Sequence, residues 1–145
     1  MNNYNLNRFI KAHSEDFDTA YHELLNGRKK SHWMWYIFPQ ISGLGKSEIA
    51  IYYSIRNLEE AKEYMKNEIL GSHMNTLVDV LLSLEQSDPI KIFDFPDNLK
   101  LCSSLTLFMY ADSSNFRFKK ALDKFFQGRV DINTINILKE LGDIE

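Results

Sequence analysis

The sequence predicts a mainly α-helical protein in which residues 1–145 form a single domain of about six to eight helices. Three observations support this fold class. Apolar residues recur three and four positions apart along most of the chain, which is the spacing of an amphipathic helix. Helix-capping residues and glycines separate these stretches. The apolar fraction of 44% and the charged fraction of 26% are ordinary for a folded globular protein, and the length of 145 residues fits one domain.

The predicted helices follow one another with short connections. They are expected at residues 5–12, from Ser14 or Asp16 to Gly27, from Ser47 to Ile55, at 58–67, from Gly71 to Glu85, and at 97–110, 114–127 and 132–141. Asn57 followed by Glu60 resembles a capping box, and glycine suits the end of a helix. Helix 97–110 is apolar on nearly every side, so we expect it at the centre. The runs 33–38 and 90–93 are too short to assign, and 33–38 is either a buried strand or a helical turn.

The apolar faces of these helices are expected to point inward. Among the residues so placed are Ile49, Ile51, Tyr52, Ile55, Leu99, Phe118, Leu122, Phe125, Phe126, Ile132, Ile135, Leu138 and Leu141.

Composition restricts the possible partners and the compartment. The net charge is −3, so the whole molecule does not attract nucleic acid or an anionic membrane, and we expect neither as a partner. The one cysteine, Cys102, cannot form an internal disulfide, which fits a reducing compartment. The chain begins without the pattern of a signal peptide, and the apolar run 33–38 is too short to span a membrane. These features predict a cytoplasmic protein whose protein partners, if it has any, the sequence does not specify.

Residues 27–40 combine positive charge, an imidazole and aromatic surface more densely than any other stretch. They contain, in order, Arg28, Lys29, Lys30, Ser31, His32, Trp33 and Trp35. The histidine could transfer a proton at neutral pH, and nearby cations would favour its neutral form. The lysines could hold phosphate or carboxylate, and the indoles could stack on a base or a sugar. The alternatives are a hydrogen-bonded structural histidine, a solvated helix end and core packing of the tryptophans.

A second candidate lies on the predicted central helix. Lys100, Ser103 and Ser104 are three and four positions apart, so they share one face of an otherwise apolar helix. A buried lysine needs a partner, which could be an internal carboxylate or an anionic ligand. Alternatively, the serines could bond back to their own helix.

The sequence Gly45-Lys46-Ser47 resembles the end of a phosphate-binding P-loop. The full motif also requires an earlier glycine, and Gln40 stands at that position. We therefore expect no nucleoside triphosphatase, but a loop in which Lys46 and backbone amides contact an anion.

Other catalytic and binding classes find little support. The histidines and Cys102 lack the spacing of metal ligands, so we expect neither a metal nor a cofactor. No Gly-x-Ser-x-Gly motif is present, although a triad assembled in space is compatible with the sequence. Arg117, Lys120 and Lys124 form a basic stripe, which we interpret as a solvated helix face rather than a nucleic-acid surface.

Several of these stretches together resemble one bacterial family, catalogued as domain of unknown function 1810 and sometimes labelled calpastatin. The resemblance rests on Gly27-Arg28-Lys29-Lys30-Ser31-His32-Trp33-Met34-Trp35-Tyr36-Ile37-Phe38-Pro39-Gln40, Gly43-Leu44-Gly45-x-Ser47, Tyr53-x-Ile55, Leu70-Gly71, Ile92-Phe93, Lys100-Leu101-x-Ser103-Ser104-x-Thr106-Leu107-Phe108 and Phe125-Phe126-x-Gly128-x-x-Asp131. It covers residues 5 to 138. Two positions depart from the family pattern: Asp94 stands where glycine is common and Cys102 where arginine is common.

The resemblance implies a small, mostly α protein without a settled activity. The composition is that of a folded domain, so nothing supports the disordered calpain inhibitor that the label suggests. The layout also resembles, at the level of architecture, the NADAR proteins, which are mostly α and act on ADP-ribose derivatives.

These observations lead to one main hypothesis, an enzyme or binder for an anionic nucleotide or an ADP-ribose-type ligand, with cleavage of an N-glycosidic bond as the reaction. The pocket is expected where residues 28–47 meet the face from Lys100 to Ser104. His32 would transfer a proton, and Glu48 is the carboxylate nearest in sequence for a glycosidic cleavage. The alternatives are a protein–protein interaction module that uses an exposed aromatic run 33–38, and a purely structural domain.

Overall fold

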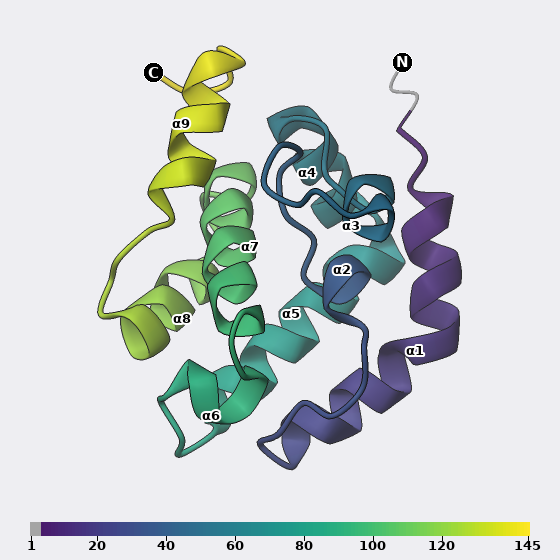
Figure 1. The fold of residues 1–145 in the computed structure, drawn as a ribbon, viewed down its shortest axis with the longest axis vertical. Coiled ribbons are helices and arrows are strands. Elements are labelled where there is room, and N and C mark those ends of the chain that lie inside the picture. Colours follow the sequence, from purple (N-terminus) through teal and green to yellow (C-terminus); the bar gives the residue numbers. More distant parts are fainter. Residues whose placement is uncertain (1–3) are drawn as a thin grey trace.

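The structure, a computed structural model, describes residues 4–145, so the first three residues of the segment tested for a signal peptide lie outside it. This part of the chain contains nine helices and no strands (Figure 1), which confirms the mainly α fold class. The helices are α1 (Asn7–Leu25), α2 (Met34–Ile37), α3 (Glu48–Tyr52), α4 (Leu58–Lys66), α5 (Glu68–Ser83), α6 (Pro89–Phe93), α7 (Asp97–Ala111), α8 (Arg117–Phe126) and α9 (Ile132–Glu140). No helix of residues 4–145 is long and apolar enough to cross a membrane.

Helix α7 lies at the centre of the fold. It packs against α4, α6, α8 and α9, while α5 contacts α1, α4 and α8 (Figure 1). The α7 segment 103–108 is buried throughout, as the sequence predicts, because neighbouring helices cover it on several sides. Leu99, however, is 52% exposed near the start of the helix, so its predicted inward position is wrong.

The aromatic run 33–38 forms a helical turn, α2, inside the core. Trp33 and Phe38 are each 1% exposed, and the Trp33 ring lies 6.4 Å from the Phe93 ring between centroids. Burial of these large rings removes much apolar surface from water, which stabilises the fold. The exposure of this run that an interaction module would require is therefore wrong, because Trp35 alone among residues 33–38 is partly accessible.

Helix α1 is continuous, whereas the sequence predicted a break near Ser14 or Asp16. The Ser14 hydroxyl donates to the carbonyl of Lys11 in its own helix, so it does not cap a new one. Asp16 instead accepts a hydrogen bond from the hydroxyl of Tyr36. Both side chains thus act within a long helix that packs against α5.

A pair of histidines joins α1 to α5. His13 Nδ1 lies 2.9 Å from His73 Nδ1, and His13 Nε2 lies 2.8 Å from the carbonyl oxygen of Tyr36. The two imidazoles stack in parallel, and His73 also stacks on Phe17 with 3.6 Å between ring centroids. Because a carbonyl only accepts, His13 Nε2 carries the proton and His13 Nδ1 accepts from His73.

The break between α4 and α5 lies at Asn67 and not at Gly71. The Asn67 side chain accepts hydrogen bonds from the backbone amides of Ile69 and Leu70, which starts α5 there. Gly71 lies within α5, and a Cβ at this position would come 2.2 Å from the carbonyl oxygen of Met65. The glycine therefore permits close packing of the two helices.

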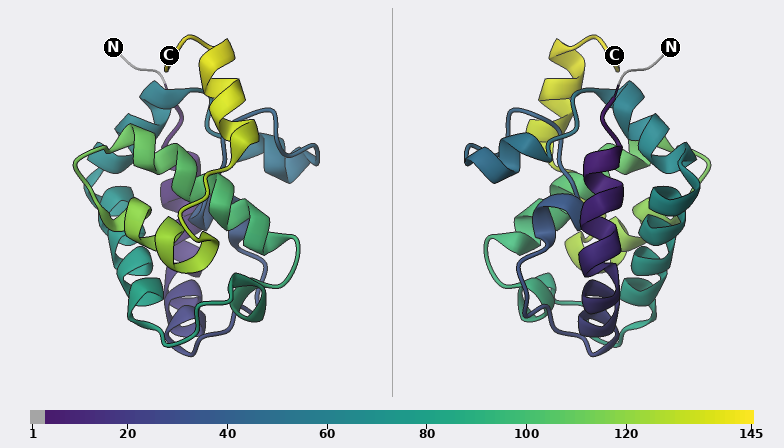
Figure 2. Two further views of the ribbon diagram at one scale, coloured as in Figure 1. Left: turned by 90° about the vertical axis from the view of Figure 1, so that its left-hand side faces the viewer. Right: turned by 90° about the vertical axis from the view of Figure 1, so that its right-hand side faces the viewer.

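Helix α3 is much shorter than predicted. Ser47 caps it as expected by accepting from the Ala50 amide, but the helix ends at Tyr52 because Ile55 pairs through its backbone with Gln40 and Ser42. α3 protrudes from the body of the molecule (Figure 2). The predicted inward positions Ile49, Ile51 and Tyr52 are therefore wrong, since these side chains are exposed, and only Ile55 is buried.

The remaining helix ends show how local chemistry sets the boundaries. Asp88 caps α6, which resolves the unassigned run 90–93 as a helical turn. Asp94 ends α6 with φ 63° and ψ 165°, a conformation that suits glycine and strains other residues.

The predicted inward faces of the last two helices are partly correct. In α9, Ile135 and Leu138 are buried as predicted, whereas Ile132 and Leu141 are exposed and contradict the prediction. Phe126 is half-buried at the end of α8.

Candidate functional site

Glu23 organises the start of the basic and aromatic stretch. Its Oε1 accepts hydrogen bonds from the backbone amides of Lys30 and Ser31 and from Trp33 Nε1, at 2.8, 2.9 and 2.9 Å. Its Oε2 accepts from the Ser31 hydroxyl at 2.5 Å. Burial acts to raise the pKa of Glu23, but these hydrogen bonds outweigh it and lower the pKa to about 2. The carboxylate of Glu23, on α1, thus fixes the positions of Ser31 and Trp33.

Asp97 brings the two predicted cationic regions together. Lys29 Nζ lies 2.9 Å from Asp97 Oδ2, and Lys100 Nζ lies 3.6 Å from Asp97 Oδ1. Lys29 also lies over the Trp33 ring, and Lys100 over the Trp35 ring. The segments 28–47 and 100–104 therefore approach each other, but a carboxylate of the same chain already balances their lysines.

The other residues proposed for this site lie apart or inside the fold. Lys30, His32, Lys46 and Glu48 are exposed, and within residues 4–145 their side chains make no hydrogen bond or ion pair. Ser104 is buried, and its hydroxyl has no hydrogen-bond partner among the described residues. Their functional roles remain predictions.

Ser103 belongs to a hydrogen-bond network between α7 and α9. Its hydroxyl donates to Asp131 Oδ2 at 2.9 Å, and the same oxygen accepts from the hydroxyl and the amide of Thr134 at 2.6 and 3.2 Å. The Asp131 amide donates to the Thr106 hydroxyl, which donates to the carbonyl of Cys102. Ser103, which the sequence indicated as a candidate because of its place on one helix, is thus the hydrogen-bond partner of Asp131, which caps α9.

Beside this network lies a cavity of about 380 Å³, which we call the α7–α9 pocket. It is lined by Gln40, Leu44, Leu99, Cys102, Ser103, Phe126, Gln127, Arg129, Val130, Asp131 and Asn133. The walls are partly apolar and partly polar, and the volume is in the range of small-molecule sites, about 300–1,000 Å³. Three separate parts of the chain thus enclose a space that could hold a ligand.

The charges in the α7–α9 pocket come from Arg129 and Asp131. Arg129 is exposed and forms no ion pair within residues 4–145. Burial and the negative charge of Asp131 raise the pKa of the Cys102 thiol to about 11, although a hydrogen bond with Thr106 acts to lower it. The thiol is therefore protonated near neutral pH and does not act as a nucleophile there.

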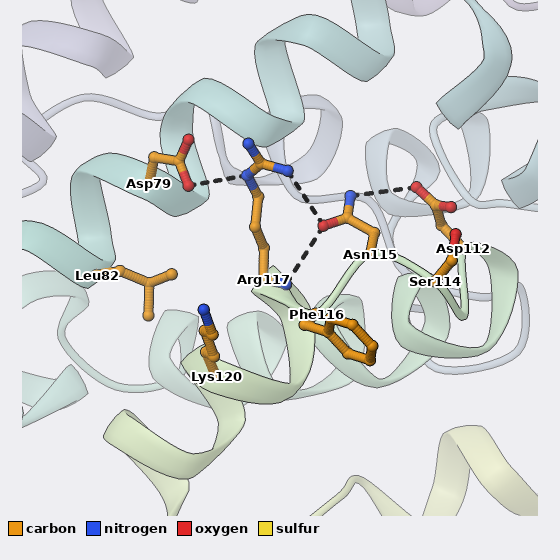
Figure 3. Close-up of a pocket in the computed structure, with 8 residues that line it drawn as sticks. All are labelled: Asp79, Leu82, Asp112, Ser114, Asn115, Phe116, Arg117 and Lys120. Carbon is orange, nitrogen blue, oxygen red and sulfur yellow. Dashed lines mark hydrogen bonds and ion pairs between the residues drawn. The ribbon is translucent and has the colours of Figure 1, made fainter.

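A larger cavity, of about 560 Å³, lies between α5 and the start of α8 (Figure 3). Arg117 spans it, with Nε donating to Asp79 Oδ1 at 2.8 Å and a guanidinium nitrogen 3.3 Å from Asn115 Oδ1. The side-chain amide of Asn115 in turn donates to Asp112 (Figure 3). Its arginine already pairs with Asp79 and its walls are mainly polar, so we regard this open cavity as a weaker ligand site than the α7–α9 pocket.

The basic stripe of α8 is also used within the chain. Lys124 Nζ donates to the carbonyls of Leu81, Leu82 and Leu84 at the end of α5. Arg117 pairs with Asp79, and only Lys120 of the stripe lacks such a contact in the described part of the chain. Two of its three cations thus stabilise helix packing.

Sequence reasoning missed several residues that shape these sites. Glu23 and Asp97 were not considered, because nothing in their local sequence shows which cations or amides they meet. Asp131 stands three residues before Thr134, a spacing that could have indicated a helix cap. Arg129 follows the basic stripe in the sequence, but neither its place in a cavity nor the α7–α9 pocket itself was predicted.

Comparison with known proteins shows which family the chain belongs to. The solved structure of the conserved hypothetical protein Rv1873 from Mycobacterium tuberculosis superposes with a TM-score of 0.93 at 38% sequence identity, covering 95% of this chain and 99% of that one. No curated protein matches the chain. The model of the family described as protein of unknown function (DUF1810) matches residues 3–138. The resemblance found in the sequence motifs is therefore confirmed, and the chain belongs to the DUF1810 family.

Proposed function

We propose that the protein binds a small anionic ligand of the nucleotide or ADP-ribose type in the α7–α9 pocket. Arg129 supplies a positive charge for a phosphate, and guanidinium suits phosphate because several of its N–H groups can donate together. Phe126 supplies a ring on which a base can stack. The size of the cavity, about 380 Å³, is compatible with a ligand of this class.

One observation carries the proposal: three stretches that are distant in sequence line the same cavity. Gln40 and Leu44 come from the first motif and the loop after it, Ser103 comes from α7, and Phe126 and Asp131 flank the link from α8 to α9. These are the stretches on which the family resemblance rests. A ligand bound in this cavity would contact all three stretches, whereas the packing of helices does not require them to line one cavity.

We extend the proposal to hydrolysis of an N-glycosidic bond. In this reaction water adds to the anomeric carbon, the bond from that carbon to the base nitrogen breaks, and the departing base takes up a proton. A carboxylate beside the sugar would stabilise the positive charge that develops there or accept a proton from the water. Asp131 is the carboxylate that lines the pocket, whereas Glu48 and His32 do not line it.

The binding proposal can be tested with a thermal-shift screen of AMP, ADP-ribose, NAD and ribose 5-phosphate. A ligand at 100 times its dissociation constant stabilises the folded state by about 2.7 kcal/mol, which is readily measured. We expect at least one compound to stabilise the wild type and to lose this effect in Arg129→Gln. Lys139→Gln, which removes an exposed cation of α9 outside the pocket, should bind as the wild type does.

Two outcomes would count against the proposal. If no compound stabilises the wild type, the pocket does not bind this ligand class. If Arg129→Gln and Lys139→Gln weaken binding equally, the effect is one of net charge and the ligand does not contact Arg129. Release of free base from NAD or AMP, followed by chromatography, tests the hydrolytic step separately.

A further inference from the structure

Asp131 is held by one of its two carboxylate oxygens. Oδ2 accepts three hydrogen bonds, from the Ser103 hydroxyl and from the hydroxyl and amide of Thr134. Oδ1 accepts no hydrogen bond from any residue of 4–145, although Asp131 lines the α7–α9 pocket. The unused oxygen is thus an acceptor whose position is fixed by contacts to its neighbour.

These contacts exceed what capping of α9 requires. An N-cap carboxylate needs only the bond from the backbone amide, here that of Thr134. The hydroxyls of Ser103 and Thr134 add two further bonds, and the Asp131 backbone amide is anchored on Thr106 of α7 at 2.9 Å. Ser103 and Thr106 are both buried, so water does not compete for these hydrogen bonds. Such a network orients the carboxylate as well as terminating a helix.

The two opposite charges of the pocket do not neutralise each other. Within residues 4–145, neither Arg129 nor Asp131 takes part in an ion pair, although both line the same cavity. A carboxylate repels phosphate and accepts hydrogen bonds from hydroxyl groups, whereas a guanidinium attracts phosphate. The pocket is therefore suited to a ligand that carries both hydroxyl donors and an anionic group.

We propose that Asp131 Oδ1 accepts hydrogen bonds from the 2′- and 3′-hydroxyls of the ligand's sugar and thereby selects ribose over a sugar that lacks them, while Arg129 binds the phosphate. This inference rests on the proposed function and assigns the orientation of the ligand within the same pocket. Asp131 is the specificity-determining residue, and Ser103 is a positioning residue that acts through it.

The test measures dissociation constants of AMP and 2′,3′-dideoxy-AMP by isothermal titration calorimetry. The dideoxy compound lacks the hydroxyls that would donate to the charged Asp131 Oδ1. Because a hydrogen bond to a charged group contributes substantially to the free energy of binding, the wild type should bind AMP about 10- to 100-fold more tightly than the dideoxy compound. In Asp131→Asn, the amide oxygen should remain at the Oδ2 position, where three donors hold it, so the amide nitrogen faces the pocket. The variant keeps the helix cap but presents a donor in place of an acceptor.

We expect Asp131→Asn to prefer AMP over the dideoxy compound by less than tenfold, because a neutral amide replaces the charged acceptor. Loss of the carboxylate also removes its repulsion of phosphate, but this affects both nucleotides alike and leaves the ratio of their dissociation constants unchanged. Ser103→Ala should reduce discrimination partly and leave binding of the dideoxy compound unchanged. A thermal unfolding midpoint of Asp131→Asn close to that of the wild type would show that the fold is intact.

The outcomes separate the two proposals. If the wild type binds both nucleotides equally and Arg129→Gln weakens both, the proposed function stands and the role of Asp131 is overturned. If Asp131→Asn still prefers AMP tenfold, the role of Asp131 is likewise overturned. If the wild type binds neither nucleotide but another compound of the thermal-shift screen binds, the role of Asp131 is overturned and the proposed function stands, because AMP carries both the phosphate and the hydroxyls that this role requires. If no compound of the screen binds either, the proposed function fails and this inference fails with it.

Discussion

Mild acid should destabilise the protein through His13. This imidazole is buried, and within the core its Nε2 donates to the Tyr36 carbonyl while its Nδ1 accepts from His73. Protonation adds an N–H to His13 Nδ1, which lies 2.9 Å from His73 Nδ1, so His73 must change its tautomer to accept from it, and a positive charge then lies buried in the core. Burial is the main reason that the pKa of His13 falls from 6.5 to about 4; the bond to Tyr36 opposes this shift, and the charge of His73 adds to it.

The size of the effect follows from the difference between the folded and unfolded states. The unfolded chain takes up a proton on His13 near pH 6.5, and the folded chain does so only near pH 4. The stability from the neutral imidazole is therefore complete above pH 6.5 and falls as the pH drops toward 4. Each pH unit in this window is worth about 1.4 kcal/mol, so lowering the pH from 7 to 5 should remove about 2 kcal/mol.

Urea unfolding, followed by circular dichroism at pH 7 and pH 5, measures this loss. The wild type should lose about 2 kcal/mol more between the two pH values than His13→Gln, whose side chain does not titrate and can still donate to the Tyr36 carbonyl. His22→Gln, which removes an exposed histidine of the same helix, is the control and should behave as the wild type does. An equal loss in wild type and His13→Gln would refute the reasoning, whatever the stability of the variant at pH 7.

Three further predictions concern the backbone and the carboxylate that organises residues 30–33. Asp94→Gly should stabilise the protein by about 1 kcal/mol, because relief of roughly 1–3 kcal/mol of backbone strain exceeds the two costs, which are the loss of an exposed ion pair and the added freedom of the unfolded chain. Asp94→Ala keeps the strain and is the control. Greater stability of Asp94→Ala than of the wild type in urea would contradict the explanation. Gly71→Ala should destabilise by about 2 kcal/mol, since the new Cβ meets the Met65 carbonyl at 2.2 Å, and an unchanged melting temperature would show that the helices can separate freely. Glu23→Gln should lower the free energy of unfolding by about 1–3 kcal/mol at pH 7. Because the pKa of Glu23 is lowered to about 2, the stability that its carboxylate contributes is present above pH 4.5 and is lost as the pH falls toward 2. The variant should therefore lose less stability than the wild type between these two pH values.

Local chemistry explains why part of the fold could be predicted. Ser47 and Asn57 cap helices through contacts with residues three positions later, which the sequence shows directly. The continuity of α1 could not be predicted in this way, because Ser14 and Asp16 are also capping residue types and only their contacts show that they act otherwise. Exposure of Ile51 depends on which elements cover α3, and periodicity contains no information about this.

The candidate site depends more strongly on long-range contacts. Lys29 and Lys100 were chosen from charge and spacing, but their shared partner Asp97 becomes visible only when the chain is folded. The role of Asp131 depends on Ser103, which is 28 positions earlier in the sequence. Sequence therefore singled out Ser103, but residues 126–133 entered only through the family resemblance, and the cavity that they share with Ser103 required the structure.

The most direct test of the central claim is a nitrogen–proton correlation spectrum of the labelled protein during titration with ADP-ribose. We expect shifts concentrated in the amides of residues 99–103 and 126–133, which surround the α7–α9 pocket. Shifts centred on residues 28–35 would place the ligand at the exposed His32 and contradict the assignment of the pocket. A spectrum that does not change at millimolar ADP-ribose would contradict the binding of this ligand class.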